Sequence, residues 1–292
     1  ATSGGGFALM TEAIGAAAMM EIPAVFINVM RAGPSTGVPT KTEQGDLWQA
    51  LGASQGDFER FIVAPIDALD AYNCVGELFN LVDRAQCPGI IISDLLISEG
   101  TFNVDPDLVD FQPEIDRGEL LVDPSPNGNY LRYAETESGI SPRVTPGHEG
   151  FVHVVATDEH DEDGVIISDE FTHPHKRRRS VEKRARKFQG VAADVPAPTL
   201  EGPQEAEVTL VGWGSTYGVI REAIEMLAEQ GVVANQLAIK WIIPFHGDVV
   251  EEILSSAKRT LLVENNHSGQ FARYLRSETG FSPNGHIRKY DG

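Results

Sequence analysis

The stretch RAGPSTGVPT, which runs from Arg31 to Thr40, combines residue types that together could bind an oxyanion. Arg31 offers a planar fork of donors that matches a carboxylate or a phosphate. Two glycines permit backbone conformations that other residues disfavour, two prolines stiffen the loop, and Ser35, Thr36 and Thr40 add short hydroxyl donors. The residues therefore indicate a rigid anion-binding loop, although a structural turn with Arg31 in a salt bridge explains them equally well.

Two other stretches contain residues that could bind a ligand, but a structural interpretation of each is simpler. VGWGST (211–216) is a glycine-rich turn that could hold an anion at a helix N-terminus. His267, in ENNHSGQ, is more typical of a capping or interface residue than of a catalytic base. The sequence has no GxSxG elbow, HExxH pair, P-loop or GxGxxG turn opening a βαβ unit, so neither a hydrolase nor a nucleotide-transfer enzyme is supported.

The composition indicates an acidic globular protein. Hydrophobic residues make up 41% of the 292 positions, and the net charge of −20 disfavours nucleic acid and anionic membranes as partners. A halophilic source would also fit this charge. Cys74 and Cys87 form no CxxC pair, so we expect this chain to hold no metal and no iron–sulfur cluster, which usually needs about four thiolates. Sparse cysteine fits the cytoplasm, and neither a membrane-spanning run nor a secretory signal is found.

The elements around the loop must position it, and their order predicts a parallel sheet. Apolar runs and helical periodicity predict buried strands alternating with helices, at 23–29, 43–51, 60–65, 66–85 and 87–98. This alternation implies right-handed crossovers within one parallel sheet. Arg31 directly follows the first strand, so the loop should lie at a carboxyl end, where open α/β sheets bind ligands.

The next region is different in character. Scattered prolines, glycines and acids predict an irregular insertion at about 100–170. HKRRRSVEKRARKF (175–188) then carries eight basic residues against one glutamate, a net charge of +7. We interpret it as a solvated helix that pairs with the acidic remainder of the chain or with a partner subunit, and an anion-binding helix is the alternative. A Pro- and Ala-rich linker is predicted at 191–205.

A second α/β unit follows the linker. Strands are predicted at 207–215, 235–245 and 258–266, and helices at 216–231, 248–257 and 267–280. The predicted domains are therefore 1–195, which includes the irregular insertion, and 205–292.

Several of these stretches resemble a known family. TSGGGFALMTEAIGAA, PAVFINVMRAGPSTGVPTKTEQGDLWQAL and SDLLISEG resemble the pyrimidine-type thiamine-diphosphate domain of 2-oxoacid:ferredoxin oxidoreductases. The stretch from EVTLVGWGS to LRSETG is similar to the transketolase C-terminal-like domain that follows in that family. The similarity covers almost the whole chain and is greatest to alpha subunits of 2-oxoglutarate-type enzymes. It implies an α/β fold in which a thiamine-diphosphate domain with a parallel sheet precedes a smaller α/β domain.

The resemblance also implies an activity. The enzyme would be an oxidoreductase that decarboxylates 2-oxoglutarate to succinyl-CoA and reduces ferredoxin, with pyruvate or a broad or branched-chain range of 2-oxoacids as alternative substrates. Arg31 would face the substrate carboxylate, Thr36 would shape the substrate pocket, and Ser35 and Thr40 would be their neighbours. A non-catalytic assembly or binding module of the same fold is the alternative from another class, and the retained Arg31 argues against it.

The implied cofactor is thiamine diphosphate with magnesium, at an interface with a beta subunit that would also carry the iron–sulfur cluster. Coenzyme A is the implied co-substrate, and the assembly would be a hetero-oligomer. The family's activating glutamate lies upstream of Ala1, so we expect the sequence to be truncated at its N-terminus and assign no cofactor-binding residue. Glu12 and Glu21 lie after the match begins, and neither is a convincing substitute. The basic helix would contact either coenzyme A or a subunit.

Overall fold

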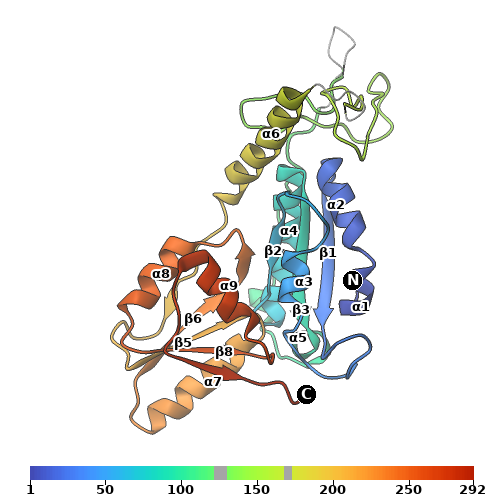
Figure 1. Ribbon diagram of the computed structural model, residues 1–292. Coiled ribbons are helices and arrows are strands. Elements are labelled where there is room, and N and C mark those ends of the chain that lie inside the picture. The colour runs from blue at the N-terminus through green and yellow to red at the C-terminus, as the bar shows by residue number, and fades with distance from the viewer. Residues whose placement is uncertain (122–129, 168–172) are drawn as a thin grey trace.

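The computed structural model describes residues 1–121, 130–167 and 173–292, which form two β-sheets with helices on their faces (Figure 1). The first sheet has the strand order β1-β3-β2-β7. Its strands are β1 (Ala24–Met30), β2 (Phe61–Val63), β3 (Pro88–Asp94) and β7 (Trp241–Ile243). β1, β3 and β2 are parallel, as the alternation of strands and helices predicts, whereas β7 is antiparallel to β2.

The central strand β3 is buried along its whole length, and its alternating side chains serve two packing layers. Ile90 and Ile92 join a hydrophobic cluster with the N-terminal helices, while Ile91 joins a second cluster on the other face. The helices of the first layer are α1 (Gly4–Ala8), α2 (Thr11–Met19) and α3 (Leu47–Leu51). The second layer contains α4 (Ala68–Ala85), which begins where Asp67 accepts a hydrogen bond of 2.8 Å from the Asp70 N–H.

Two of the predicted strands differ from the structure. β1 was expected to be buried, but only Asn28 and Met30 are, because β1 is the edge strand of its sheet, with β3 on one side and only the isolated bridge from Thr2 on the other. The strand predicted at 87–98 ends at Asp94. The Asp94 carboxylate accepts hydrogen bonds from the backbone of the next turn, which starts the short helix α5 (Leu95–Glu99) instead of extending the strand.

The region between α5 and α6 contains little regular structure in the part of it that is described. A 3₁₀ turn, η1 (Pro106–Leu108), and isolated bridges are its regular features there. The chain then enters α6 (Pro174–Ala192), which lies at the end of the molecule far from the second sheet in Figure 1. The first part of the predicted linker therefore belongs to α6.

The basic side chains of helix α6 form ion pairs within this chain. Six of its basic side chains pair with carboxylates of the same chain, namely Lys176 with Asp161, Arg177 and Arg184 with Glu159, Arg186 with Glu135, and Lys183 and Lys187 with Glu21. Pairing with the acidic remainder was thus predicted correctly. The helix is not simply a solvated face, because Lys183 and Lys187 are buried.

The second sheet has the order β4-β6-β5-β8-β9. Its strands are β4 (Leu200–Glu201), β5 (Val208–Trp213), β6 (Ala234–Ile239), β8 (Thr260–Glu264) and β9 (Gly285–Arg288), and its helices are α7 (Thr216–Glu229), α8 (Gly247–Ser256) and α9 (Gln270–Thr279). β6, β5, β8 and β9 are parallel to one another, and β4 is antiparallel to β6. The sequence did not predict β4 or β9.

The prediction of a single strand at 235–245 is wrong. The chain leaves β6 at Ile239 and enters β7 at Trp241, so one apolar run supplies a strand to each sheet. Lys240 marks the division, and its ammonium group lies 2.6 Å from Asp70 and 2.8 Å from Glu77 of α4. These ion pairs hold the chain against the first part of the molecule at the point where it changes sheets.

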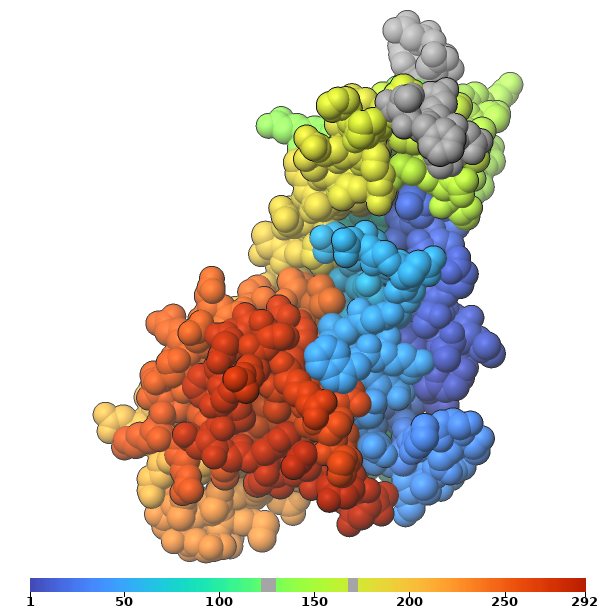
Figure 2. All heavy atoms as spheres, in the orientation of Figure 1, coloured from blue at the N-terminus to red at the C-terminus, as the bar shows by residue number. Residues whose placement is uncertain are grey.

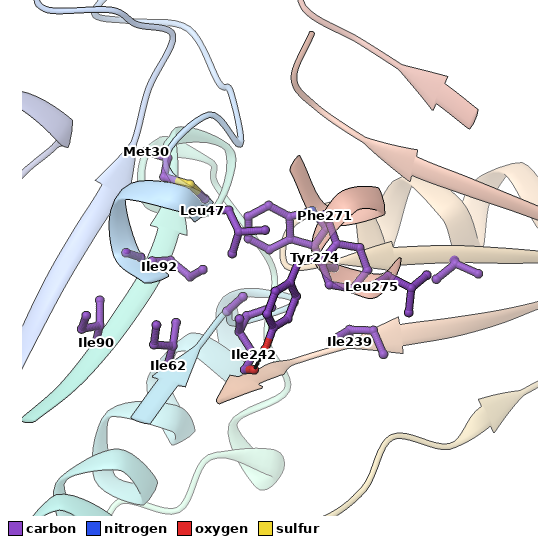
Figure 3. Close-up of a cluster of buried hydrophobic side chains, with 14 of the residues drawn as sticks. Met30, Leu47, Ile62, Ile90, Ile92, Ile239, Ile242, Phe271, Tyr274 and Leu275 are labelled. Atoms are coloured by element: carbon purple, nitrogen blue, oxygen red, sulfur yellow. Dashed lines mark hydrogen bonds between the residues drawn. The ribbon is translucent and has the colours of Figure 1, made fainter. Parts of the chain in front are cut away.

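The two parts share one hydrophobic core. Ile62 and Ile92 of the first sheet belong to the same cluster as Ile239, Phe271 and Leu275 of the second part (Figure 3). The Tyr274 hydroxyl donates a hydrogen bond of 2.6 Å to the Ile242 carbonyl within it. Figure 2 shows the C-terminal part packed along the N-terminal segments. No helix among the described residues is long and apolar enough to cross a bilayer.

Candidate functional site

The loop that starts at Arg31 leaves the carboxyl end of β1, where Met30 pairs with Asp94, the last residue of β3. The Val38 N–H donates to the Ala32 carbonyl, and the Ala32 N–H donates to the Lys41 carbonyl, each over 3.0 Å. These bonds close the loop directly beside Arg31. A closed loop is therefore present at the predicted strand end.

Arg31 is half-buried, and its Nε atom is buried without a hydrogen-bond partner. Among the described residues, no carboxylate lies within salt-bridge distance of its guanidinium group, in contrast to the buried ammonium groups of Lys183 and Lys187. The alternative of a structural turn in which Arg31 forms a salt bridge therefore does not describe this loop. A buried donor without an acceptor costs free energy, so the site is suited to an incoming anion.

Ser35, Thr36 and Thr40 lie on the exposed part of the loop. Within the described residues none of their hydroxyls forms a hydrogen bond, so all three are available to a ligand. Ser35 has a φ of 56° and Gly37 a φ of 54°, so the loop turns through the left-handed region twice. The structure thus presents the three hydroxyls and Arg31 on one closed loop, with Arg31 deeper than the others.

Asn28 and Asp46 complete the polar surroundings of Arg31, and the sequence analysis missed both. Asn28 Nδ2 donates to Asp46 Oδ2 over 3.1 Å, and the buried Asn28 Oδ1 has no partner. Burial raises the pKa of Asp46, while the Asn28 hydrogen bond and the positive charge of Arg31 act to lower it. An asparagine inside the apolar run PAVFINV was the one signal that could have identified this group.

The glycine-rich turn at 211–216 has a structural role here. Ser215, at the start of α7, donates a hydrogen bond to the buried Asp94 carboxylate. Burial raises the pKa of Asp94, and its hydrogen bonds from Ser215, Ile97 and Leu96 oppose this shift. The turn therefore joins the carboxyl ends of β5 and β3, and the simpler interpretation of this motif accounts for the contacts seen.

His267 lies against Tyr290, with ring centroids 4.8 Å apart. The capping role at α9 belongs to its neighbours: Glu264 accepts from the Phe271 N–H over 2.9 Å, and Asn266 accepts from the Gly269 N–H over 2.8 Å. Capping was thus predicted for the right segment but for the wrong side chain, and an interface role for His267 stays a prediction.

Neither of the two glutamates considered as a coenzyme activator is suitable. Glu21 is held by the ammonium groups of Lys183 and Lys187, which outweigh the opposing effect of burial and lower its pKa from 4.5 to about 2. A carboxylate that acidic is a poor base at neutral pH. Glu12 is exposed on α2.

Comparisons with known proteins agree with this architecture. Residues 1–180 match the family model "Pyruvate flavodoxin/ferredoxin oxidoreductase, thiamine diP-bdg", and residues 206–285 match "Pyruvate:ferredoxin oxidoreductase core domain II". The alpha subunit of 2-oxoacid:ferredoxin oxidoreductase 2 from Aeropyrum pernix is 38% identical over 100% of this chain and 45% of its own length. The 2-oxoglutarate synthase subunit KorA of Archaeoglobus fulgidus is 30% identical over 94% of this chain and 69% of its own length.

A solved structure is also similar over nearly the whole chain. It is the 2-oxoglutarate:ferredoxin oxidoreductase from Magnetococcus marinus with 2-oxoglutarate, coenzyme A and succinyl-CoA bound, and it matches with a TM-score of 0.84 at 30% identity. The match covers 99% of this chain and 49% of that one, so the chain spans about half the length of several relatives that it matches. The predicted fold class is confirmed. The chain belongs to the thiamine-diphosphate-binding family of pyruvate flavodoxin/ferredoxin oxidoreductases and is similar to the alpha subunits of 2-oxoacid:ferredoxin oxidoreductases.

Proposed function

We propose that this chain is the substrate-binding part of the alpha subunit of a coenzyme A-dependent 2-oxoacid:ferredoxin oxidoreductase. The single observation that carries the proposal is the buried, unpartnered Nε of Arg31 at the carboxyl end of β1. A 2-oxoacid has a carboxylate next to its reacting carbonyl, and a guanidinium fork binds a carboxylate through parallel hydrogen bonds. Arg31 would therefore hold the 1-carboxylate and fix the orientation of the carbonyl beside it.

The surroundings of Arg31 support this role. Its half-buried position lowers the effective dielectric constant, which strengthens the attraction between the guanidinium group and a bound carboxylate. Thr36 would contact the distal part of the substrate and so influence substrate choice, with Ser35 and Thr40 as neighbouring donors. All three hydroxyls are exposed on the same loop and can reach a ligand without breaking an existing bond.

The described residues fit the substrate better than the coenzyme. Within the described ranges, no group of three His, Cys, Asp or Glu side chains could hold a metal ion. Glu21 already forms ion pairs with two lysines. When bound, thiamine diphosphate would supply the nucleophilic carbon and the electron sink for decarboxylation. We propose that it binds with magnesium at an interface with a beta subunit, which would also carry the iron–sulfur cluster that reduces ferredoxin. No part in coenzyme activation is assigned to this chain.

The proposed substrate is 2-oxoglutarate, and coenzyme A would accept the succinyl group. The similarity to the KorA subunit and to the Magnetococcus marinus enzyme supports this substrate. The Aeropyrum pernix relative carries the general name 2-oxoacid, which favours a broader range as the second candidate. A non-catalytic module would have no need of an unpaired arginine at this depth.

The test is to co-express the complete gene that encodes this chain with that of its beta subunit. Reduction of ferredoxin or methyl viologen is then measured with 2-oxoglutarate, pyruvate or 2-oxoisovalerate, with and without coenzyme A. We expect the largest kcat/KM with 2-oxoglutarate. A larger value with another 2-oxoacid would overturn the substrate, and no reduction with any of them would overturn the enzyme function.

Arg31→Ala in the same complex tests the residue itself. We expect kcat/KM for the 2-oxoacid to fall by about 100-fold or more, because a charge-assisted hydrogen-bond pair contributes roughly 3 kcal/mol. Arg31→Lys keeps the charge but loses the fork, so its activity should be intermediate. Arg276→Ala, at an exposed position of α9, is the matched control and should behave as wild type.

A further inference from the structure

Gln44 lies four residues after the loop that ends at Thr40, and it is fully buried. Its Nε2 donates to the Trp213 carbonyl over 2.8 Å, and its Oε1 accepts from the Asn265 N–H over 2.9 Å. Its backbone N–H donates to the Asn265 carbonyl over 2.6 Å, and its own carbonyl accepts from Asn266 Nδ2 over 3.1 Å. Every hydrogen-bonding group of Gln44 except one spare amide proton is therefore used, and all its partners belong to the second α/β unit.

The partners of Gln44 lie at the carboxyl ends of two neighbouring strands of the second sheet, β5 and β8. β6 and β8 lie on opposite sides of β5, so the chain changes direction across the sheet between β5 and β8. In open α/β sheets the crevice at such a switch point, beyond the carboxyl ends of the strands, is the usual ligand site. Trp213 ends β5 and Asn265 follows β8, so the side chain of Gln44 lies in that crevice.

A short series of hydrogen bonds leads from Gln44 back to Arg31. Asn265 Nδ2 also donates to the Thr42 carbonyl over 3.0 Å. The next residue toward the loop, Lys41, accepts the Ala32 N–H over 3.0 Å, and Ala32 is covalently bonded to Arg31. The second unit is therefore hydrogen-bonded to the downstream end of the loop at Thr42. The adjacent residue, Lys41, is hydrogen-bonded to Ala32, which is next to Arg31.

Packing alone does not require a buried amide at this position. The shared hydrophobic core already joins the two parts of the chain, and an apolar side chain of similar size could fill the same space. A buried amide whose hydrogen bonds are satisfied instead specifies one arrangement, because any shift of the loop would leave polar atoms without partners.

We infer that Gln44 is a positioning residue for Arg31, and that the second α/β unit uses its switch-point crevice to hold the substrate loop instead of a ligand. This inference rests on the proposed role of Arg31 in binding the substrate carboxylate. It predicts that loss of the Gln44 amide lowers the efficiency with which the 2-oxoacid is used but leaves the use of coenzyme A unchanged.

The experiment is a double-mutant cycle in the assembled enzyme with Gln44→Met and Arg31→Ala. Gln44→Met alone should lower kcat/KM for the 2-oxoacid by about tenfold or more and change the KM for coenzyme A less than about twofold. In the Arg31→Ala background, Gln44→Met should have an effect of less than about twofold, because the residue that it positions is gone. Gln270→Met is the matched control. It removes bonds to Gly45 and Trp48 at the same interface but downstream of Gln44, so it should leave kcat/KM unchanged.

The possible outcomes separate the two ideas. If Arg31→Ala does not affect 2-oxoacid use, the proposed function fails and this inference fails with it. If Arg31→Ala is deleterious but the effect of Gln44→Met persists undiminished in that background, or is matched by Gln270→Met, only the positioning role is overturned. Should Gln44→Met not fold, Gln44→Glu takes its place in the cycle. It keeps the acceptor for the Asn265 N–H and loses the Nε2 donor to Trp213, and the same outcomes apply.

Discussion

Lys187 Nζ lies 2.7 Å from Glu21 Oε2, and both side chains are only 2% exposed. Lys183 Nζ lies 2.9 Å from the other oxygen of the same carboxylate, so one buried negative charge faces two buried positive charges. The three residues join the end of α2 to α6, which are about 160 positions apart in the sequence. Breaking a buried ion pair by removing one partner is strongly destabilising, because the remaining charge stays uncompensated.

Glu21→Gln should therefore lower the free energy of unfolding by roughly 3–5 kcal/mol. The measurement is chemical denaturation at pH 7, followed by circular dichroism. Glu135→Gln is the control, because it breaks an ion pair with Arg186 on the same helix in which both side chains are about 40% exposed. Such a pair contributes at most about 1 kcal/mol. If both variants lowered the free energy of unfolding equally, the buried ion pairs of Glu21 would stabilise the protein no more than the exposed pair of Glu135.

The same cluster predicts a pH dependence. The two lysines lower the pKa of Glu21 to about 2, below its ordinary value of 4.5. The stabilisation by this carboxylate should then be complete above pH 4.5 and be lost as the pH falls from 4.5 towards 2. We expect the difference in free energy of unfolding between wild type and Glu21→Gln to shrink across that window. A difference that stays constant down to the acid limit would contradict the assignment.

Much of the architecture could be predicted because it depends on local signals. The helix at 66–85 was predicted from its apolar spacing, and it is observed at Ala68–Ala85. Gly231, with a φ of 80°, follows α7 as expected for a glycine after a helix C-terminus. The position of the Arg31 loop followed from one strand and the rule that ligand sites lie at carboxyl ends.

The rest depends on contacts between distant residues, which no local pattern reveals. An apolar run such as 235–245 looks the same whether it forms one strand or is shared by two sheets. The basic helix showed an excess of charge, but its partners Glu21 and Glu135 lie far away in the sequence. Gln44 lies in the stretch that resembles the family, but its burial could not be predicted, because a single glutamine near a short helix is ordinary on a surface.

Both cysteines are predicted to be unreactive in the folded protein. Cys74 and Cys87 are free and buried, and burial raises the pKa of each thiol to about 12. Near pH 8 only about one thiol in 10⁴ would be ionised, and the thiolate is the reactive form. Iodoacetamide should label neither cysteine in native protein and both after denaturation, as mass spectrometry of the intact chain would show. Fast native labelling would mean that these thiols are accessible.

Gly37 is the position at which the substrate loop should be most sensitive to a single methyl group. Its φ of 54° is unfavourable for other residues, and a Cβ atom there would lie 2.1 Å from the Ala32 carbonyl oxygen. That oxygen accepts the Val38 N–H and helps to close the loop, so the clash cannot be relieved without opening it. Gly37→Ala should then lower kcat/KM for the 2-oxoacid by about tenfold or more, because misplacing a binding group by about 1 Å can cost 100-fold.

The matched control for this variant is Gly218→Ala in α7, where an added Cβ atom meets nothing within 4 Å. A glycine inside a helix is less favourable than alanine by about 1 kcal/mol, so this control should be neutral or slightly stabilising. Steady-state kinetics of the assembled enzyme and thermal denaturation should be measured together. A Gly37→Ala enzyme with normal kcat/KM would show that the closed form of the loop is not needed for substrate binding. A fall in kcat/KM with unchanged thermal stability would place the effect in the loop itself.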